Sequence, residues 1–385
     1  MKIAIVHDQL AEFGGAERVL ISLKQMYPAA DVFVSFVDVK RLGIHLSKFK
    51  DWKIIQSRAQ YIPFFTRLYS PLRFLLPWVW RSFNLSSYDL VICSSSWGMS
   101  KGVSLQKLKL QKNIPTYVCY LHTPPRYLYG YDESSLKKYF VVRLYAQIVN
   151  HFLRMYDFES SQTIDQFIFN SEEIRKRSLA FYRKDGIVIH PPISTTVSEH
   201  QSNSNIPNPK DSYFLTISRL APTKHIDILI HACNKLGAPL IIVGTGNQIE
   251  HLQSIAGPTI TFKGHVPDSE FAELYRGARA FLYASVNEDF GMVPVEAMSF
   301  GVPVIAYASG GVKETVTHLE RGVQYKELTP DAICKAIAEY DNLSESEKQR
   351  ILENGRAFAL TCSEGEFTSK IRAYIASLTK MHDHT

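Results

Sequence analysis

Two carboxylates eight residues apart are the side chains in this sequence best placed for binding chemistry. Glu288 and Glu296 belong to the segment EDFGMVPVE, which follows an apolar run typical of a buried strand. We expect Glu288 on the loop after that strand and Glu296 on a helix that begins near Pro294. Across such a junction both can face one ligand, and a carboxylate suits two adjacent hydroxyls such as those of a ribose or hexose.

The residues around these carboxylates add the features of an anion site. Four backbone amides lie at the N-terminus of the expected helix, where the helix dipole favours a phosphate. They belong to Phe290, Gly291, Met292 and Val293. Arg219 and Lys224 follow another expected strand and suit a diphosphate, because Arg offers a fork of donors and Lys a point charge. Two ordinary surface cations are the alternative interpretation.

Two further motifs follow expected strands in the first half of the chain. Gly14 and Gly15 open the helical stretch GGAERVL, where a glycine turn lets backbone amides approach a phosphate, although a plain tight turn is equally consistent. His122 lies in CYLHTPPRY at the end of another run, where a lone histidine is usually structural. No G-x-G-x-x-G follows the first strand, which argues against an NAD-dependent dehydrogenase.

Composition restricts the class of protein. With 45% hydrophobic and 21% charged residues, the 385-residue chain can bury a large core. Its five scattered cysteines form no C-x-x-C pair, which argues against a disulfide framework or a zinc site. The N-terminal apolar run is too short for a signal peptide, and no run reaches the roughly 18 residues of a membrane span. We therefore expect a cytoplasmic protein, at most peripheral on the inner membrane face.

Charge is divided unevenly along the chain. Residues 1–193 hold 26 Lys and Arg against 15 Asp and Glu, whereas residues 194–385 hold 17 against 22. The aromatic segment 61–83 also carries Arg67, Arg73 and Arg81. Such a segment suits contact with an anionic membrane surface, or short helices packed on the N-terminal sheet. No nucleic-acid-binding motif accompanies the basic half, so we expect no nucleic-acid partner.

Strand-like runs alternate with helical stretches in both halves, which predicts an α/β fold with two doubly wound parallel sheets. The expected strands are 3–6, 32–36, 90–93, 117–121, 167–169, 187–189, 214–217, 240–243, 260–262, 280–283 and 304–306. The expected helices include 16–26, 136–161 and 364–378. The polar stretch 194–212 has two prolines and predicts an interdomain linker. In such folds ligands bind at the carboxyl ends of strands.

Several segments together resemble the family 4 glycosyltransferases of the GT-B fold, over essentially the whole chain. EDFGMVPVEAMSFGVPVI carries the resemblance, and GGAERV, SRLAPTKHID, VGTGNQIEHL, FKGHVPDSEFAELYRGARAFLYAS and SGGVKETV occur in the expected order. HTPPRY resembles the mannosyltransferase-like branch. Asp289 and His225 depart from the commoner motif, which has glycine at both positions, and this leaves the loop geometry open.

The resemblance implies two facing Rossmann-like domains with a cleft between them. Residues 1–195 would form the acceptor-side domain, with a C-terminal helix at 364–385 packing back on it, and residues 210–363 the donor domain. Glu296 is expected to bind the ribose and Glu288 the donor sugar, while the backbone at Val266 meets the base. The clamp on the diphosphate would consist of Arg219, Lys224 and the Gly14–Gly15 turn. His122 and Glu288 are the expected catalytic residues, with His122 by the anomeric carbon.

The function implied by this resemblance is retaining transfer of a hexose from a nucleotide-diphosphate sugar. The acceptor would be a glycan or a lipid-diphosphate-linked glycan in surface polysaccharide synthesis, and HTPPRY favours mannose from GDP-mannose. No cofactor and no metal is expected, because the sequence contains no D-x-D and offers cations for the diphosphate. A sugar-nucleotide epimerase of the same fold and a UDP-sugar-dependent transferase are the alternatives. The acceptor, the linkage and the oligomeric state cannot be predicted.

Overall fold

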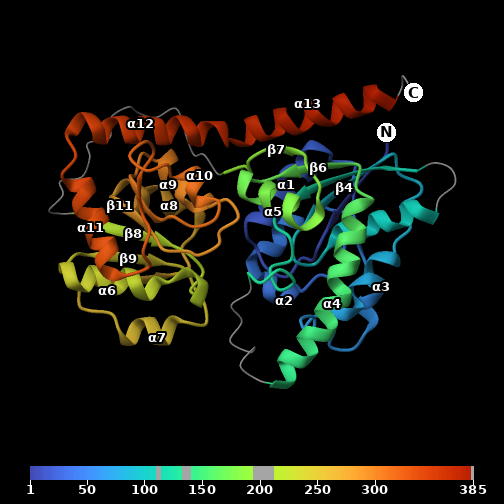
Figure 1. The fold of residues 1–385 in the computed structure, drawn as a ribbon, viewed down its shortest axis with the longest axis horizontal. Coiled ribbons are helices and arrows are strands. Elements are labelled where there is room, and N and C mark those ends of the chain that lie inside the picture. The colour runs from blue at the N-terminus through green and yellow to red at the C-terminus, as the bar shows by residue number, and fades with distance from the viewer. Residues whose placement is uncertain (110–113, 132–139, 194–211, 383–385) are drawn as a thin grey trace. The chain divides into compact units, whose positions relative to one another are not determined.

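The computed structural model describes residues 1–109, 114–131, 140–193 and 212–382, and the chain divides into two compact units (Figure 1). The first comprises Met1–Pro192 with Thr368–Thr385, and the second Ile193–Phe367. Of the linker expected at 194–212, all but Ser212 lies outside the described residues, as do residues 136–139 of an expected helix.

The first unit contains a sheet of seven parallel strands in the order β3-β2-β1-β4-β5-β6-β7. Its strands are β1 (Ile3–His7), β2 (Asp31–Val34), β3 (Ile54–Gln56), β4 (Leu90–Ser95), β5 (Thr116–Leu121), β6 (Gln166–Phe169) and β7 (Ile187–Val188). Its helices are α1 (Gly15–Met26), α2 (Val39–Leu42), α3 (Leu76–Arg81), α4 (Phe140–Gln162) and α5 (Glu172–Tyr182), with 3-10 segments η1 (Gly43–Phe49), η2 (Arg58–Tyr61), η3 (Arg73–Leu75) and η4 (Ser100–Lys109).

The second unit contains six parallel strands in the order β10-β9-β8-β11-β12-β13. The strands are β8 (Tyr213–Ile217), β9 (Leu240–Val243), β10 (Ile260–Gly264), β11 (Ala278–Tyr283), β12 (Val304–Tyr307) and β13 (Val323–Tyr325). The helices are α6 (Ile226–Leu236), α7 (Ile249–Ser254), α8 (Phe271–Arg276), α9 (Met292–Ser299), α10 (Val312–Thr315), α11 (Pro330–Asp341) and α12 (Glu345–Thr361), with η6 (Pro222–Lys224) and η7 (Asp268–Glu270).

Side-chain alternation along the strands builds a core on each face of the sheets. In β11, Phe281 and Tyr283 pack with α9, whereas Ala280 and Leu282 pack with α6 and α11. Figure 1 shows α9 and α12 on one face of this sheet and α6 on the other. Burial on both faces explains why these strands read as continuous apolar runs in the sequence.

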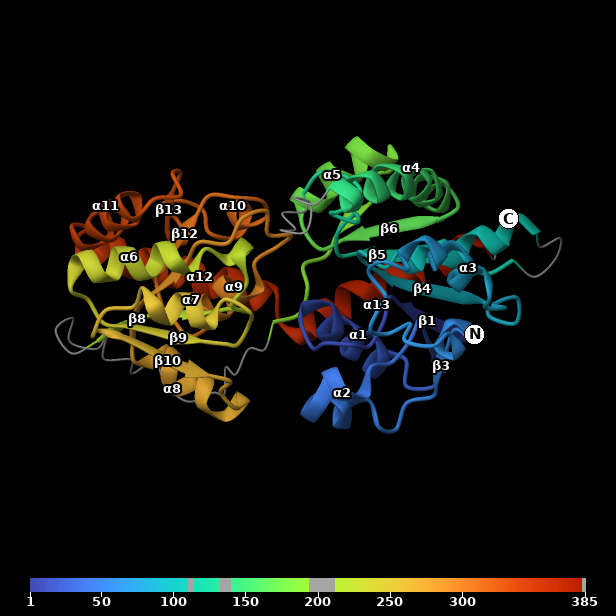
Figure 2. The ribbon, with the colours of Figure 1, turned by 90° about the horizontal axis from the view of Figure 1, so that it is seen from below.

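Helices cover both faces of the first sheet as well. Figures 1 and 2 show α4 on one face and α13 (Glu364–His382) on the other. The hydroxyl of Tyr374 in α13 donates to Oε1 of Gln166 in β6 over 2.9 Å. None of the described helices has both the length and the apolar content needed to cross a membrane.

In each sheet the first strand of the unit, β1 or β8, lies inside the sheet, and later strands are added on both sides of it. The order reverses between β1 and β4 in the first unit and between β8 and β11 in the second. Doubly wound sheets bind ligands at the carboxyl ends of the strands that flank such a reversal. The prediction of two Rossmann-like parallel sheets is therefore confirmed, and it directs attention to the loops after these four strands.

Candidate functional site

Two residues predicted from motifs 64 positions apart meet at the reversal point of the second sheet. Lys224 ends η6 after β8, Glu288 follows β11, and the Lys224 ammonium forms an ion pair with Oε1 of Glu288. The Ser285 hydroxyl donates to the same oxygen over 2.6 Å. The loops are joined by the Val286 amide, which donates to the Thr223 carbonyl over 3.1 Å. The Lys224 ammonium and the Glu288 carboxylate therefore lie side by side at the carboxyl ends of β8 and β11.

A glycine pair after β12 fixes the backbone of Glu288. The Gly311 amide donates to the Glu288 carbonyl over 2.8 Å, and the Asn287 amide donates to the Ser309 hydroxyl over 2.9 Å. Gly310 has a φ of +57°, and a Cβ there would lie 2.2 Å from the Glu288 carbonyl oxygen. Only glycine fits this approach without displacing the loop. The segment SGGVKETV therefore has a structural role that its sequence alone does not indicate.

Helix α9 begins directly after the Glu288 loop. Gly291 caps it with a φ of +88°, and the helix starts at Met292, two residues earlier than expected. Its first amides lack helical carbonyl partners, which gives the Phe290–Val293 stretch the anion-binding character of a helix N-terminus. Glu296 lies in the second turn and is buried. Glu288 and Glu296 thus occupy the loop and the helix to which the sequence assigned them.

The other predicted donor ligands follow β8 and β10. Arg219 is exposed two residues beyond β8, and Val266 is buried two residues beyond β10. The loops after β9 and β10 are tied by the Gly244 amide, which donates to the Gly264 carbonyl over 2.8 Å. Arg219, Lys224, Val266 and Glu288 therefore all lie on loops at the carboxyl edge of one sheet.

The two departures from the commoner motif have different structural meanings. His225 adopts a left-handed backbone with a φ of +47° between η6 and α6, a conformation that favours glycine. Asp289 is not among the described residues with positive φ, so its backbone makes no such demand. His225 therefore adopts the left-handed conformation that glycine would adopt at this position, at some cost in backbone strain.

In the first unit, His122 ends a chain of four buried polar side chains at the carboxyl ends of the strands. Its Nε2 lies 2.8 Å from the Ser94 hydroxyl, which lies 3.0 Å from Nδ1 of His7. Nε2 of His7 lies 3.5 Å from Oε1 of Glu17 in α1. The Gly14 amide in turn donates to Oε2 of Glu17 over 2.8 Å. The chain connects the glycine turn to His122.

Ser94 links the two histidines of this chain. Each ring nitrogen can donate or accept, depending on the tautomer, and a hydroxyl can do both. The Ser94 hydroxyl can therefore donate to one ring nitrogen while it accepts from the other. His7, Glu17 and Ser94 were missed by sequence reasoning, although GGAE has the glycine-to-glutamate spacing of a capping box.

Burial keeps the His122 ring uncharged. Loss of solvation, followed by the neighbouring His7, lowers the pKa of His122 to about 3. The Asn170 side chain donates to the His122 carbonyl over 2.9 Å, and the His122 amide donates to Ser95 over 2.9 Å. At neutral pH this histidine can exchange hydrogen bonds but cannot serve as a cation.

Asp8 anchors the loop that follows Ser94. Its carboxylate accepts from the Ser96 amide and hydroxyl and from the amides of Gly98 and Ser100, over 2.8–2.9 Å. These bonds connect the end of β1 to the loop after β4. Asp8 thus holds the backbone on which Ser94 is placed, and its role is structural support.

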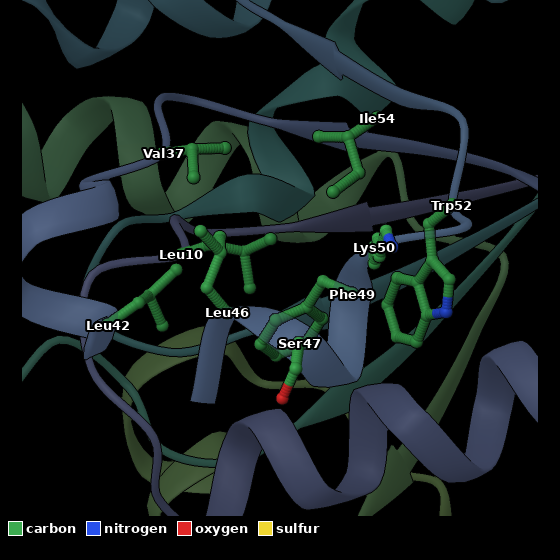
Figure 3. A pocket seen from close by; sticks show the side chains of 9 residues that line it. All are labelled: Leu10, Val37, Leu42, Leu46, Ser47, Phe49, Lys50, Trp52 and Ile54. Carbon is green, nitrogen blue, oxygen red and sulfur yellow. The ribbon is translucent and has the colours of Figure 1, made fainter. Parts of the chain in front are cut away.

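An apolar hollow of about 470 Å³ also lies in the first unit (Figure 3). Leu10, Phe49 and Trp52 line it, and the polar lining residues are Ser47 and Lys50. A nucleotide diphosphate needs several converging donors, which this lining does not provide. The chemistry therefore points to the strand ends rather than to this hollow.

Comparisons with known families agree with the motifs. Residues 13–197 match the family described as Glycosyltransferase Family 4, and residues 197–358 match Glycosyl transferases group 1. A GDP-mannose-dependent alpha-mannosyltransferase of Mycobacterium tuberculosis is 32% identical over 153 residues. That match covers 38% of this chain and 40% of the relative. A GDP-mannose-dependent alpha-(1-6)-phosphatidylinositol monomannoside mannosyltransferase of the same species is 35% identical over 32% of this chain and 36% of its own length.

Solved structures share the fold over nearly the whole chain. The crystal structure of Anabaena Alr3699/HepE in complex with UDP and glucose has a TM-score of 0.70 at 21% identity, covering 98% of this chain and 100% of that one. Sucrose-phosphate synthase from Thermosynechococcus elongatus has a TM-score of 0.71 at 19% identity, covering 99% and 100%. At such identities the likeness concerns the fold.

Proposed function

Because the chain belongs to the family 4 glycosyltransferases of the GT-B fold, we propose that it moves a hexose from a nucleotide-diphosphate sugar to a glycan acceptor with retention at the anomeric carbon. The observation that carries this proposal is the convergence of Lys224 and Glu288 beside the N-terminus of α9. These groups supply a phosphate ligand and a sugar ligand at one strand edge.

In the proposed complex, the second unit holds the donor. Arg219 and Lys224 neutralise the diphosphate, with the amides of Phe290–Val293 and the Gly14–Gly15 turn as further donors. An ammonium group has three N–H donors, so Lys224 can keep Glu288 and still contact a phosphate oxygen. Glu296 binds the ribose, and the backbone at Val266 meets the base. Departure of the nucleotide is assisted because fixed cations and amides stabilise its growing negative charge.

The proposed chemical step needs no covalent intermediate. The acceptor hydroxyl attacks the face from which the nucleotide leaves, and a phosphate oxygen of the leaving group takes the hydroxyl proton. Glu288 orients the sugar. His122 assists beside the oxocarbenium-like centre, and its low pKa supports that role, because a charged imidazolium would repel a developing carbocation. No metal is required in this scheme, since Arg219, Lys224 and the amides balance the charge.

GDP-mannose is the proposed donor. HTPPRY and the names of the two mycobacterial relatives support mannose, and both of those relatives are GDP-mannose-dependent. The Anabaena protein, by contrast, was solved with UDP, which keeps a UDP-sugar as the second candidate. The proposed acceptor is a glycan, in particular one linked to a lipid diphosphate in surface polysaccharide synthesis at the inner membrane face.

A transfer assay with product analysis tests this function. The protein is incubated with radiolabelled GDP-mannose or UDP-glucose and a membrane lipid extract, with and without EDTA, and the product linkage is determined by NMR. We expect an α-linked product and unchanged activity in EDTA. An inverted linkage, or activity abolished by EDTA and restored by Mg²⁺ or Mn²⁺, would contradict the mechanism. Conversion of the free sugar nucleotide without transfer would support an epimerase instead.

A further inference from the structure

Helix α4 buries polar side chains and exposes apolar ones, the reverse of the usual arrangement in a surface helix. Its buried residues include Asn150, Asp157, Ser160 and Ser161, whereas most of its large apolar side chains are exposed. A surface helix normally presents its apolar stripe to the core and its polar side to water. The inversion calls for a partner on the outer side of α4.

Two buried polar side chains of α4 bind other segments of the fold. Asp157 forms an ion pair with Lys101 and accepts the hydroxyl protons of Tyr129 and Tyr182 over 2.9 and 2.7 Å. Asn150 accepts from the Arg73 guanidinium and donates to the Tyr127 carbonyl, both over 3.0 Å. These bonds fix the rotation of the helix, so the apolar side faces outward.

The exposed apolar residues form one stripe, which we call the α4 stripe. It consists of Val141, Leu144, Ile148, Phe152 and Met155. Their spacing of three or four residues places them on one side of the helix. Phe152 is 64% exposed and Ile148 54% exposed. From Val141 to Met155 the stripe is about 21 Å long, at 1.5 Å per residue. It is therefore a contiguous apolar patch, unlike the single exposed apolar residues that most surfaces carry.

The segment 61–83 adjoins this stripe and is itself divided between core and surface. Trp80 is buried and its indole donates to the Gly98 carbonyl, so this residue belongs to the core. Other large apolar side chains are exposed, namely Tyr61, Phe64, Leu68, Phe74 and Trp78. Arg73 connects the two segments. Its guanidinium carbon lies 5.2 Å from the ring centre of Tyr145 in α4 and 4.9 Å from that of Tyr127.

The charges of both segments have one sign. From Trp52 to Tyr88 the chain contains five Lys and Arg and no Asp or Glu, and from Phe140 to Tyr156 its charged residues are Arg143 and Arg154. The first exposed carboxylate of α4 is Glu159, beyond the stripe. Apolar side chains edged by arginines match the interface of an anionic bilayer, where the apolar part enters the headgroup layer and the cations meet phosphates.

We propose that the α4 stripe, with the exposed residues of 61–78, is the surface by which this protein docks on an anionic membrane. A second copy of the chain is disfavoured as the occupant, because it would place arginines opposite arginines. The inference rests on the proposed function for the kind of acceptor, which would then be a lipid-linked glycan presented at that surface. The docking itself is measurable without any sugar transfer.

Vesicle co-sedimentation tests the proposal. The full chain is mixed with vesicles of phosphatidylcholine alone or with 30 mol% phosphatidylglycerol added. The test variant combines Leu144→Gln, Ile148→Gln and Phe152→Gln. The matched control combines Leu179→Gln, Leu236→Gln and Leu360→Gln, whose exposed fractions of 44%, 45% and 51% are similar but whose positions lie on α5, α6 and α12. A second variant, Arg67→Gln with Arg143→Gln, tests the charges.

We expect wild type and control to bind the anionic vesicles equally, and the stripe variant to bind at least tenfold more weakly. The charge variant should bind more weakly and lose most of its dependence on salt. Equal binding by wild type and stripe variant would overturn the proposal, as would an absence of wild-type binding. A dimer that the stripe variant alone converts to monomer, with vesicle binding unchanged, would assign the stripe to a second copy instead. Donor titration of the same variants separates this result from failure of the proposed function, since docking variants should keep donor affinity.

Discussion

At the scale of single residues, His122 lies at the end of a chain of buried polar side chains. Ser94 is the shared link between His122 and His7, and Glu17 lies at the far end of the chain, 3.5 Å from Nε2 of His7. Sequence motifs indicated His122 because it belongs to HTPPRY. They could not indicate Ser94, since a serine in the run CSSSW carries no spacing signal until β4 and β5 are paired.

Replacing Ser94 with alanine should reduce turnover more than donor affinity. The change leaves Nε2 of His122 without its hydrogen-bond partner in a buried setting, which costs about 1–3 kcal/mol, or roughly 5- to 150-fold in rate if the whole cost appears at the transition state. Steady-state kinetics would measure kcat and KM for the donor. Ser86→Ala is the control, because the Ser86 hydroxyl bonds Asn84 in its own exposed turn. An unchanged kcat for Ser94→Ala would remove the chain from the account.

The lowered pKa of His122 predicts a loss of stability in acid. The ring is neutral in the folded state down to about pH 3, whereas in the unfolded chain it gains a proton near pH 6.5. The unfolded state therefore binds the extra proton, and the free energy of unfolding falls by on the order of 1 kcal/mol per pH unit between these values. Urea unfolding at pH 7 and pH 5 should show a smaller loss for His122→Gln than for wild type. Equal losses would contradict the neutral ring.

At the scale of elements, the first unit relies on a buried ion pair between η4 and α4. Lys101 and Asp157 are both completely buried. Lys101→Met leaves the carboxylate without its cation and should destabilise the protein by about 3–5 kcal/mol. Lys235→Met removes an exposed pair with Asp331, which water and salt screen, and should change the free energy of unfolding far less. Chemical unfolding of both variants measures the difference, and similar costs would show that the α4 anchor is weaker than described.

The Glu288 loop depends on the glycine after β12. Gly310→Ala combines a left-handed backbone with a contact of 2.2 Å to the Glu288 carbonyl oxygen. Gly237→Ala has a similar φ of +61° but no atom within 4 Å, so it should show the backbone cost alone, about 1–2 kcal/mol. We expect Gly310→Ala to cost more in thermal unfolding and to weaken donor binding. Equal costs and unchanged donor affinity would mean that the loop moves freely.

Most of the parallel strands could be predicted because strands buried on both faces are continuous apolar runs. β3 and β13 were missed because each has three residues and lies at a sheet edge, where the apolar signal is short. Helix α4 was predicted, but not which side it buries. Its rotation is set by Lys101, Tyr129 and Tyr182, which are distant in the sequence from Asp157.

At the scale of the whole molecule, family membership and fold could be predicted from ordered motifs, while the substrates could not. R-x4-K follows β8 and E-x7-E begins on the loop after β11, and these neighbouring strands bring Lys224 to Glu288. We proposed that the base meets the backbone near Val266, and backbone contacts of this kind would carry no residue signature to distinguish guanine from uracil. The roles of Glu296, Val266 and His122 stay predictions.

Calorimetric titration of the donor tests the central claim most directly. GDP-mannose and UDP-glucose are titrated into wild type, Arg219→Ala and Lys224→Ala, with Lys235→Ala as a surface control. We predict that wild type and control bind one of these donors with equal affinity. Each clamp variant should lose about 1.5–3 kcal/mol of binding free energy, roughly 10- to 150-fold in Kd. Unchanged donor affinity in both clamp variants, or the absence of binding by either sugar nucleotide to wild type, would contradict the account.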